Sequence, residues 1–146
     1  MKRVLMIAVI AFGAAQIIRP SRTNPPVDPK LAIGSVLAVD TAVTAIFDRS
    51  CNDCHSHRTV WLWYSNVAPI SWLIAHDVND GREDLNFSQW GSYSAERREK
   101  RLGDICKKVT KGDMPGVPYT LLHPSAKLTQ ADVQAICRWT ESAKKR

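Results

Sequence analysis

The sequence predicts an all-α fold, and three observations lead to this prediction. Three segments place apolar residues on one face at helical spacing, and residues that favour helix ends flank these three and one further segment. No segment alternates polar and apolar residues for long enough to predict a strand, and the chain has no internal repeat. The part of the 146-residue chain that follows its N-terminal segments has the length of one small domain.

Residues 1–18 have the pattern of an export leader. Lys2 and Arg3 supply positive charge, and an uncharged, mostly apolar run follows them to Ile18. As a helix, 15 such residues measure about 22 Å, which is shorter than the roughly 30 Å hydrocarbon core of a bilayer. Small residues before Gln16 offer a cleavage site, but the apolar run continues beyond it. Both a cleaved signal peptide and an uncleaved N-terminal membrane anchor fit this pattern.

Residues 19–30 form a proline-rich linker. Four prolines in 12 residues exclude a helix, so we expect an extended segment. At about 3.1 Å per residue, it would hold a domain roughly 35 Å from a membrane or another module. A disordered tail behind a cleaved leader is the alternative. Residues 31–146 are then predicted to form a single domain.

The first two helices of this domain are short. One is predicted at residues 40–49, after the candidate N-cap Asp40, and it leads directly into the cysteine motif described below. Its apolar face consists of Val39, Val43, Ile46 and Phe47. The second is predicted at residues 71–79, because it follows Pro69 and because Gly81 is expected to end it.

Two longer helices complete the domain, with long loops expected between the helices. One is predicted at residues 95–111, between an N-cap at Ser94 and a stop at Gly112. The last begins after Thr129, which forms a capping-box-like pattern with Asp132. Their apolar faces consist of Leu102, Ile105, Cys106 and Val109 on the first and Val133, Ile136 and Cys137 on the second.

Residues 51–55, Cys-Asn-Asp-Cys-His, are the one stretch that indicates a chemistry. In a C-x-x-C-H motif the thiols add to the two vinyl groups of haem, and the histidine ligates its iron. The motif therefore predicts one covalently attached haem c, with thioethers at Cys51 and Cys54 and His55 as proximal ligand. Half of a zinc site and a redox dithiol are the alternatives. The other two cysteines lack the spacing of a second zinc-ligand pair, and the chain lacks the βαβ pattern of thioredoxin.

Cys106 and Cys137 are candidates for a disulfide. Each lies on the apolar face of a predicted helix, and the leader predicts export to a compartment in which thiols oxidise. Closing a loop of this length would stabilise the fold by about 3–4 kcal/mol in the chain-entropy model, less any strain. Two unconnected buried thiols are the alternative.

Aromatic and basic residues near the motif are candidate haem contacts. Trp63 and Trp72 belong to a group of five tryptophans, four of them within 30 residues. Indole rings can cover a macrocycle, and their N–H groups can donate to haem propionates, although ordinary core packing is the alternative. Arg82 is expected either to pair with a propionate or to form a surface salt bridge.

Two blocks of sequence resemble the bacterial haem-binding domain family of single-haem, cytochrome c-like proteins. They are CNDCHSHRTVWLWYSNVAPISWLIAHDVNDGREDLNFSQW, from residue 51, and ICKKVTKGDMPGVPYTLLHP, from residue 105. The resemblance implies a small cytochrome c-like helical domain wrapped around one haem, with Met114 as the distal iron ligand. Two positions depart from the family's pattern, His57 where asparagine is usual and Leu62 where proline is usual. His57 adds a competing imidazole close to the iron.

Met114 is also the candidate distal ligand from its position, 59 residues after His55 in a loop beyond the third helix. Thioether sulfur favours ferrous iron, so His/Met ligation raises the reduction potential relative to two histidines. His76 on the second helix is the main alternative ligand, followed by His123 and His57. A core methionine that fills a gap is the alternative role of Met114.

These features predict an exported monohaem c-type cytochrome that carries single electrons and is not an enzyme. It is expected in the periplasm or at the outer face of the cytoplasmic membrane. The alternatives are a haem enzyme or a gas or peroxide sensor with an open distal site, and a haem subunit of a larger membrane redox complex. The net charge of +6 favours acidic or membrane-bound redox partner proteins. No basic motif predicts nucleic-acid binding.

Overall fold

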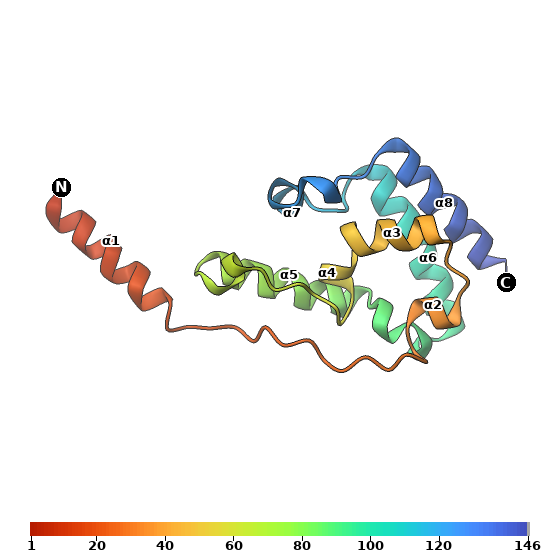
Figure 1. The fold of residues 1–146 in the computed structure, drawn as a ribbon, viewed down its shortest axis with the longest axis horizontal. Coiled ribbons are helices and arrows are strands. Elements are labelled where there is room, and N and C mark those ends of the chain that lie inside the picture. The colour runs from red at the N-terminus through yellow and green to blue at the C-terminus, as the bar shows by residue number, and fades with distance from the viewer. Residues whose placement is uncertain (146) are drawn as a thin grey trace.

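The computed structural model describes residues 1–145, and within them the chain forms α-helices and short 3-10 helices (η) without a strand. The all-α fold class is therefore confirmed (Figure 1). The elements in chain order are α1 (Lys2–Ala15), α2 (Ile33–Val36), α3 (Thr41–Ser50), α4 (Asn52–His55), η1 (Trp63–Asn66), α5 (Ile70–Asp84), η2 (Phe87–Ser92), α6 (Ala95–Lys111), α7 (Val117–Leu122), η3 (Pro124–Ala126) and α8 (Gln130–Lys144).

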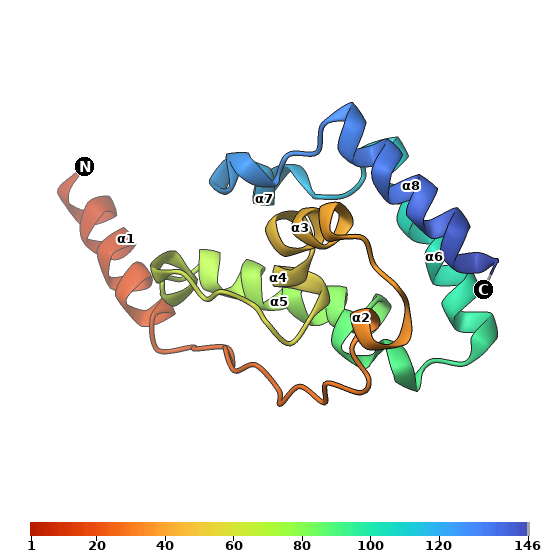
Figure 2. The same cartoon turned by 45° about the vertical axis from the view of Figure 1, so that its right-hand side comes forward.

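The core of the domain lies where α3 and η2 meet α6 and α8. Helices α6 and α8 lie side by side, and α3 packs against α8 (Figure 2). Phe47 of α3 stacks on Phe87 of η2, with ring centroids 4.8 Å apart, and it meets the edge of Trp139 of α8 at 5.4 Å. Buried aliphatic side chains fill the space between these rings, and they include Ile46, Leu102, Ile105, Val109 and Ile136. This core forms the back wall of the candidate site.

Helix α6 begins and ends as the sequence predicts, and α8 begins as predicted. Ser94 caps α6 by accepting a hydrogen bond from the backbone N–H of Arg97, and Gly112 ends the helix with φ of 74°, a left-handed conformation that favours glycine. At the start of α8, Thr129 and Asp132 form a capping box. A disulfide joins Cys106 of α6 to Cys137 of α8, with Cα atoms 4.8 Å apart, so the predicted pairing is also confirmed.

Helix α5 differs from its prediction, because it continues through Gly81 and ends at Asp84. Gly81 is needed for a close approach between two segments rather than for a helix end. A Cβ atom at this position would lie 2.7 Å from the carbonyl oxygen of Cys54, so only glycine lets α4 lie against α5. The long loops expected between the helices are also interrupted, since they contain short helices such as α4 and α7.

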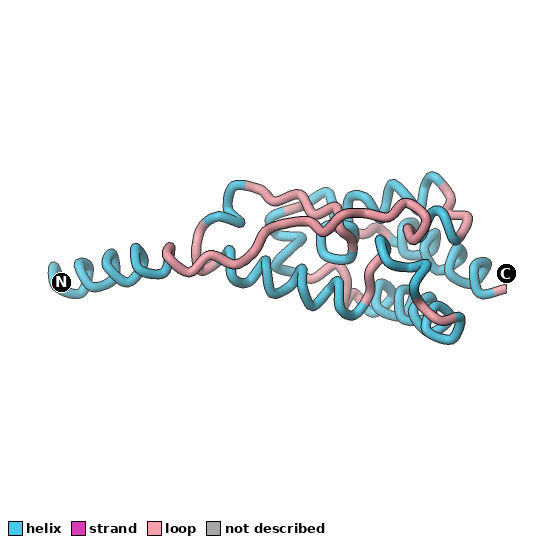
Figure 3. Tube along the Cα trace, turned by 90° about the horizontal axis from the view of Figure 1, so that it is seen from below, coloured by secondary structure: helices cyan, strands magenta, loops and turns pink. Residues whose placement is uncertain are grey.

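The N-terminal segments lie on one side of the domain. Helix α1 has no buried residue and extends away from the other helices (Figure 1). Within residues 1–145, no helix combines the length and the apolar character needed to cross a membrane. Residues 19–28 contain no helix, as predicted, and this segment runs along the domain as a long loop (Figure 3). It is hydrogen-bonded to the domain at several points.

Candidate functional site

The cysteine motif forms a sharp turn between two helices. Helix α3 ends at Ser50, and Cys51 leaves the helical conformation with φ of −130° and ψ of −40°. Its carbonyl oxygen then accepts hydrogen bonds from the backbone N–H of Cys54, at 3.2 Å, and of His55, at 2.9 Å. These bonds form the single turn α4, which places both thiols and the imidazole close together.

The imidazole of His55 is held by backbone carbonyls of a different helix. Its Nδ1 atom lies 2.9 Å from the carbonyl oxygen of Gly81 and 3.0 Å from that of Leu85. Because a carbonyl can only accept, Nδ1 must carry the hydrogen, and Nε2 keeps its lone pair. A histidine that ligates a metal through Nε2 commonly donates its other ring N–H in this way. The structure therefore holds the His55 ring in one orientation and leaves Nε2 free to bind a metal ion.

Two cavities adjoin this turn. The first, which we call the methionine cavity, contains Cys51, His55 and Met114 in its lining. Apolar residues of the core and of α6 form most of its wall, namely Phe47, Leu85, Phe87, Ile105, Val109 and Ile136. Asp84, Arg101, Asp104 and Lys108 also line it, and the buried Nε of Arg101 has no hydrogen-bond partner. The cavity thus offers an imidazole, a thiol and a thioether in a mainly apolar space.

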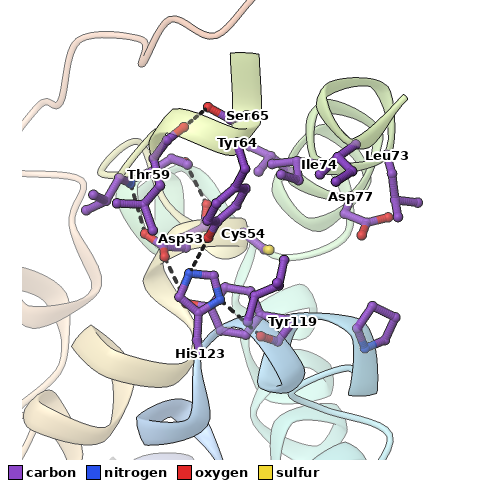
Figure 4. A pocket seen from close by; sticks show the side chains of 16 residues that line it. Asp53, Cys54, Thr59, Tyr64, Ser65, Leu73, Ile74, Asp77, Tyr119 and His123 are labelled. Carbon is purple, nitrogen blue, oxygen red and sulfur yellow. Dashed lines mark hydrogen bonds between the residues drawn. The ribbon is translucent and has the colours of Figure 1, made fainter. Parts of the chain in front are cut away.

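The second cavity, which we call the tyrosine cavity, contains Cys54 in its lining (Figure 4). Helix α5 and the loop before it supply apolar residues on one side, and α7 supplies Pro118 and Leu122. Tyr64, Tyr119 and His123 add polar groups. The two motif cysteines therefore face two different cavities, and a cofactor bonded to both would extend across them.

Met114 lies in the loop between α6 and α7, and its side chain is 44% exposed. It is not a buried core methionine, which was the alternative role for this residue. Since His55 lines the same cavity, the structure brings together two residues that are 59 positions apart in the sequence. An imidazole nitrogen and a thioether sulfur are a known pair of axial haem ligands.

The thiols of the motif are half-buried, and this environment raises the pKa of both. Burial raises the pKa of Cys51 to about 12, with a further contribution from Cys54. Burial also raises the pKa of Cys54 to about 11, with contributions from the Asp53 and Asp77 carboxylates. Reactive redox dithiols need a lowered pKa, so this environment does not favour that alternative. Among residues 1–145, no group of three or more His, Cys, Asp or Glu side chains is placed to hold a metal ion.

A chain of polar contacts joins the tyrosine cavity to the motif (Figure 4). The Tyr64 hydroxyl lies 2.8 Å from Nε2 of His123, and His123 Nδ1 lies 3.0 Å from the carbonyl oxygen of Tyr119. The Tyr119 hydroxyl donates to Asp53 at 2.8 Å. Sequence reasoning named His123 only as a possible ligand and missed both tyrosines. The (i, i+4) spacing of Tyr119 and His123 was the available signal.

The other histidines use their ring nitrogens elsewhere. His76 is largely exposed, pairs with Asp80 at 3.3 Å and lines neither cavity. His57 is buried, with Nδ1 lying 3.2 Å from the Pro26 carbonyl and Nε2 lying 2.9 Å from Nδ2 of Asn86. His57 therefore anchors the proline-rich segment and does not line either cavity.

Three further sequence candidates lie away from both cavities. Arg82 donates its hydrogen bonds to residues of the loop after the motif and of the proline-rich segment. Trp63 is 77% exposed, and the indole of Trp72 donates to the carbonyl of Ile18 at 2.8 Å. Aliphatic side chains and Phe47 and Phe87 form the cavity walls instead, so no tryptophan is needed there.

Comparison with known proteins identifies the cofactor. A family model described as a haem-binding domain matches residues 10–142. This range includes the proline-rich segment, the motif and both cavities. No curated protein and no solved structure gave a significant match.

Proposed function

This chain belongs to the haem-binding domain family, and we propose that it is an exported monohaem c-type cytochrome that carries single electrons. The observation that carries this proposal is the placement of the His55 imidazole. Its Nδ1 is hydrogen-bonded to two backbone carbonyls, and the ring lines a cavity that Cys51 and Met114 also line. A proximal haem ligand needs a free Nε2 in a fixed orientation.

Five residues of the chain would hold the haem in this proposal. Cys51 and Cys54 would bond its two vinyl groups, and they are free while the other two cysteines form a disulfide. His55 and Met114, which line the same cavity, would be the two ligands of the iron. Arg101 lines the methionine cavity with a buried Nε that has no partner, so it is the candidate for a propionate contact. The bound haem supplies a one-electron couple between ferric and ferrous iron.

The residues of the site would influence the reduction potential of this couple. Hydrogen bonds from Nδ1 of His55 fix the ring and raise the basicity of Nε2. The mainly apolar linings of both cavities would surround most of the haem with apolar side chains, and the thioether of Met114 would favour the ferrous state. With His55 and Met114 both holding the iron, the haem would supply electron transfer alone, and the site would need no group that moves protons to a substrate.

We further propose that the chain works in the periplasm or at the outer face of the cytoplasmic membrane. The leader pattern and the disulfide between Cys106 and Cys137 support export, since disulfides persist mainly in oxidising compartments. Exposed apolar side chains along α1 support membrane attachment if this helix is retained. Basic residues on α6, among them Lys107, Lys108 and Lys111, favour an acidic or membrane-bound redox partner.

The proposal is tested by expressing the full chain with a cytochrome c maturation system. A pyridine haemochrome spectrum should show one c-type haem per chain, which stays with the protein in acid acetone. The double variant Cys51→Ser with Cys54→Ser should lose its haem to this solvent. A low-spin ferric spectrum supports the electron carrier, whereas a high-spin spectrum would support the enzyme or sensor. Haem lost from the wild-type chain would refute covalent attachment.

A further inference from the structure

Gln16 and the proline-rich segment that follows it are attached to the domain through specific side-chain contacts. The amide of Gln16 donates to the carbonyl of Ala68 at 3.2 Å and accepts from the N–H of Ala68 at 2.9 Å. Farther along, Arg22 donates to the carbonyl of Ser65 at 2.9 Å. These contacts hold residues 16–26, which we call the strap, against η1 and the loop before α5.

The strap then reaches the loop that directly follows the motif turn. Nδ2 of Asn24 donates to the carbonyl of Thr59 at 2.9 Å, and Oδ1 of Asn24 accepts from Nε1 of Trp61 at 3.2 Å. Two residues later, the carbonyl of Pro26 lies 3.2 Å from Nδ1 of His57. The loop over residues 57–61 is therefore held from outside by backbone and side-chain groups of the strap.

Arg82 connects the strap to the turn that carries His55. Its Nη2 donates to Oδ1 of Asn24 at 2.7 Å and to Oγ1 of Thr59 at 2.9 Å. Its Nε donates to the carbonyl of Ser56, the residue after His55, at 2.8 Å. Arg82 also follows directly on the α5 residue whose carbonyl accepts the His55 ring N–H. One guanidinium therefore fixes the exit from the motif turn, α5 and the strap together.

External bonds of this kind matter because α4 is a single turn. So short a helix has no stability of its own, and its orientation is set by its contacts. Oγ1 of Thr59 also donates to the carbonyl of Asp53 within the motif, at 2.6 Å. The contacts of Asn24 thus continue, through Thr59 and Arg82, to both ends of the turn. Loss of Asn24 would leave the Thr59 carbonyl and one Arg82 donor without these partners.

We propose that Asn24 and Arg82 are positioning residues for the proximal histidine, so that the proline-rich segment belongs to the haem site. The role rests on the proposed function, in which His55 ligates the iron. If the turn shifts, the hydrogen bonds from Nδ1 of His55 lengthen and Nε2 becomes less basic. A less basic ligand stabilises ferric iron less, so the reduction potential rises.

The test compares Asn24→Ala with Arg22→Ala in the full chain loaded with haem. Arg22→Ala is the matched control, because it removes a contact between the strap and η1 but no contact with the loop after the motif. Asn24→Ala should keep full haem content, raise the reduction potential and shift the ferric electron paramagnetic resonance g-values. Arg22→Ala should keep the wild-type potential and g-values.

A second measurement is independent of haem. In the full chain as isolated, whether or not it carries haem, hydrogen–deuterium exchange over residues 52–60 should accelerate in Asn24→Ala and in Arg82→Lys, but not in Arg22→Ala. This exchange result decides the positioning role even if the wild-type chain binds no covalent haem, which would contradict only the proposed function. The positioning role would be overturned if residues 52–60 exchanged at the wild-type rate in Asn24→Ala. It would also be overturned if their exchange accelerated equally in Arg22→Ala.

Discussion

The hydroxyl of Tyr119 donates a hydrogen bond of 2.8 Å to Oδ2 of Asp53, so helix α7 is tied to the turn that carries the cysteine motif. The other carboxylate oxygen, Oδ1, accepts from the backbone N–H of Val60 at 2.9 Å. Met114 lies in the loop directly before α7. One carboxylate inside the motif therefore holds both the loop that follows His55 and the helix that follows the proposed distal ligand.

Replacing Tyr119 by phenylalanine should weaken this connection. Asp53 would keep its bond from Val60 but lose the one from α7, and removing one partner of such a bond costs about 1–3 kcal/mol. The free energy of unfolding from urea titration should fall by this amount at neutral pH. Tyr64→Phe is the control, because it removes a hydroxyl of the same cavity that contacts His123 and not the motif. An equal loss in both variants would contradict a special role for the bond to Asp53.

The same tyrosine predicts a pH dependence. Burial, and next the hydrogen bond to Asp53, raise the pKa of Tyr119 above its usual value in the folded state. Above about pH 10 the unfolded chain releases this proton while the folded chain retains it, so the stability declines as the pH rises. Urea titrations between pH 9 and 11, which bracket that value of about 10, should show a smaller decline for Tyr119→Phe than for the wild type. If the stability of Tyr119→Phe declines as steeply as that of the wild type, other groups cause the pH dependence.

Gly81→Ala should destabilise the chain and disturb the site. The new Cβ would lie 2.7 Å from the carbonyl oxygen of Cys54, so α4 must move away from α5, and overpacking of this kind costs about 1–3 kcal/mol. Gly103→Ala in α6 is the matched control, because its Cβ would meet only Lys144, at 3.6 Å. An alanine at such a helical position stabilises by about 0.4–1 kcal/mol. Thermal unfolding should show a lower melting temperature for Gly81→Ala and a higher one for Gly103→Ala than for the wild type. An unchanged melting temperature in Gly81→Ala would contradict the close packing of α4 on α5.

The long helices could be predicted because their signals are local. Helix α6 carries its N-cap Ser94 and its stop Gly112 in the sequence, and α8 carries its capping box. Short elements such as α4 and α7 could not be predicted, since contacts with distant segments stabilise them. Gly81 shows the same limit, because its role depends on a carbonyl group of α4 that only the folded chain brings near.

The candidate site, likewise, could be predicted from the sequence only in part. Cys51, Cys54 and His55 could be found from their spacing, because the chemistry of attachment requires it. The groups that accept the hydrogen bonds from the His55 ring are backbone carbonyls. Every residue has a backbone carbonyl, so the sequence does not indicate which ones accept. Arg82 was recognised as a functional candidate, but the sequence does not reveal that its partners lie in the loop and the proline-rich segment.

Removal of the disulfide should cost stability without changing the haem site. Cys106 and Cys137 join α6 to α8 at the end of the core, and their replacement by alanine should lower the free energy of unfolding by about 2–5 kcal/mol. The absorption spectrum of the folded variant should match that of the wild type, because neither sulfur lines a cavity. Mass spectrometry of native protein, alkylated without reduction, should find no label on either cysteine. Labelling of both would show that the disulfide does not form in the cell.

Met114→Ala tests the proposed distal ligand most directly. A ferric haem with histidine and methionine ligands has a weak charge-transfer band at the edge of the near infrared, which a haem with two histidines lacks. Met114→Ala should abolish this band, shift the iron toward high spin and lower the reduction potential, because the ligand that favours ferrous iron is gone. His76→Ala should leave all three properties unchanged, since His76 pairs with Asp80 and lines neither cavity. A silent Met114→Ala together with a disruptive His76→Ala would instead indicate bis-histidine ligation.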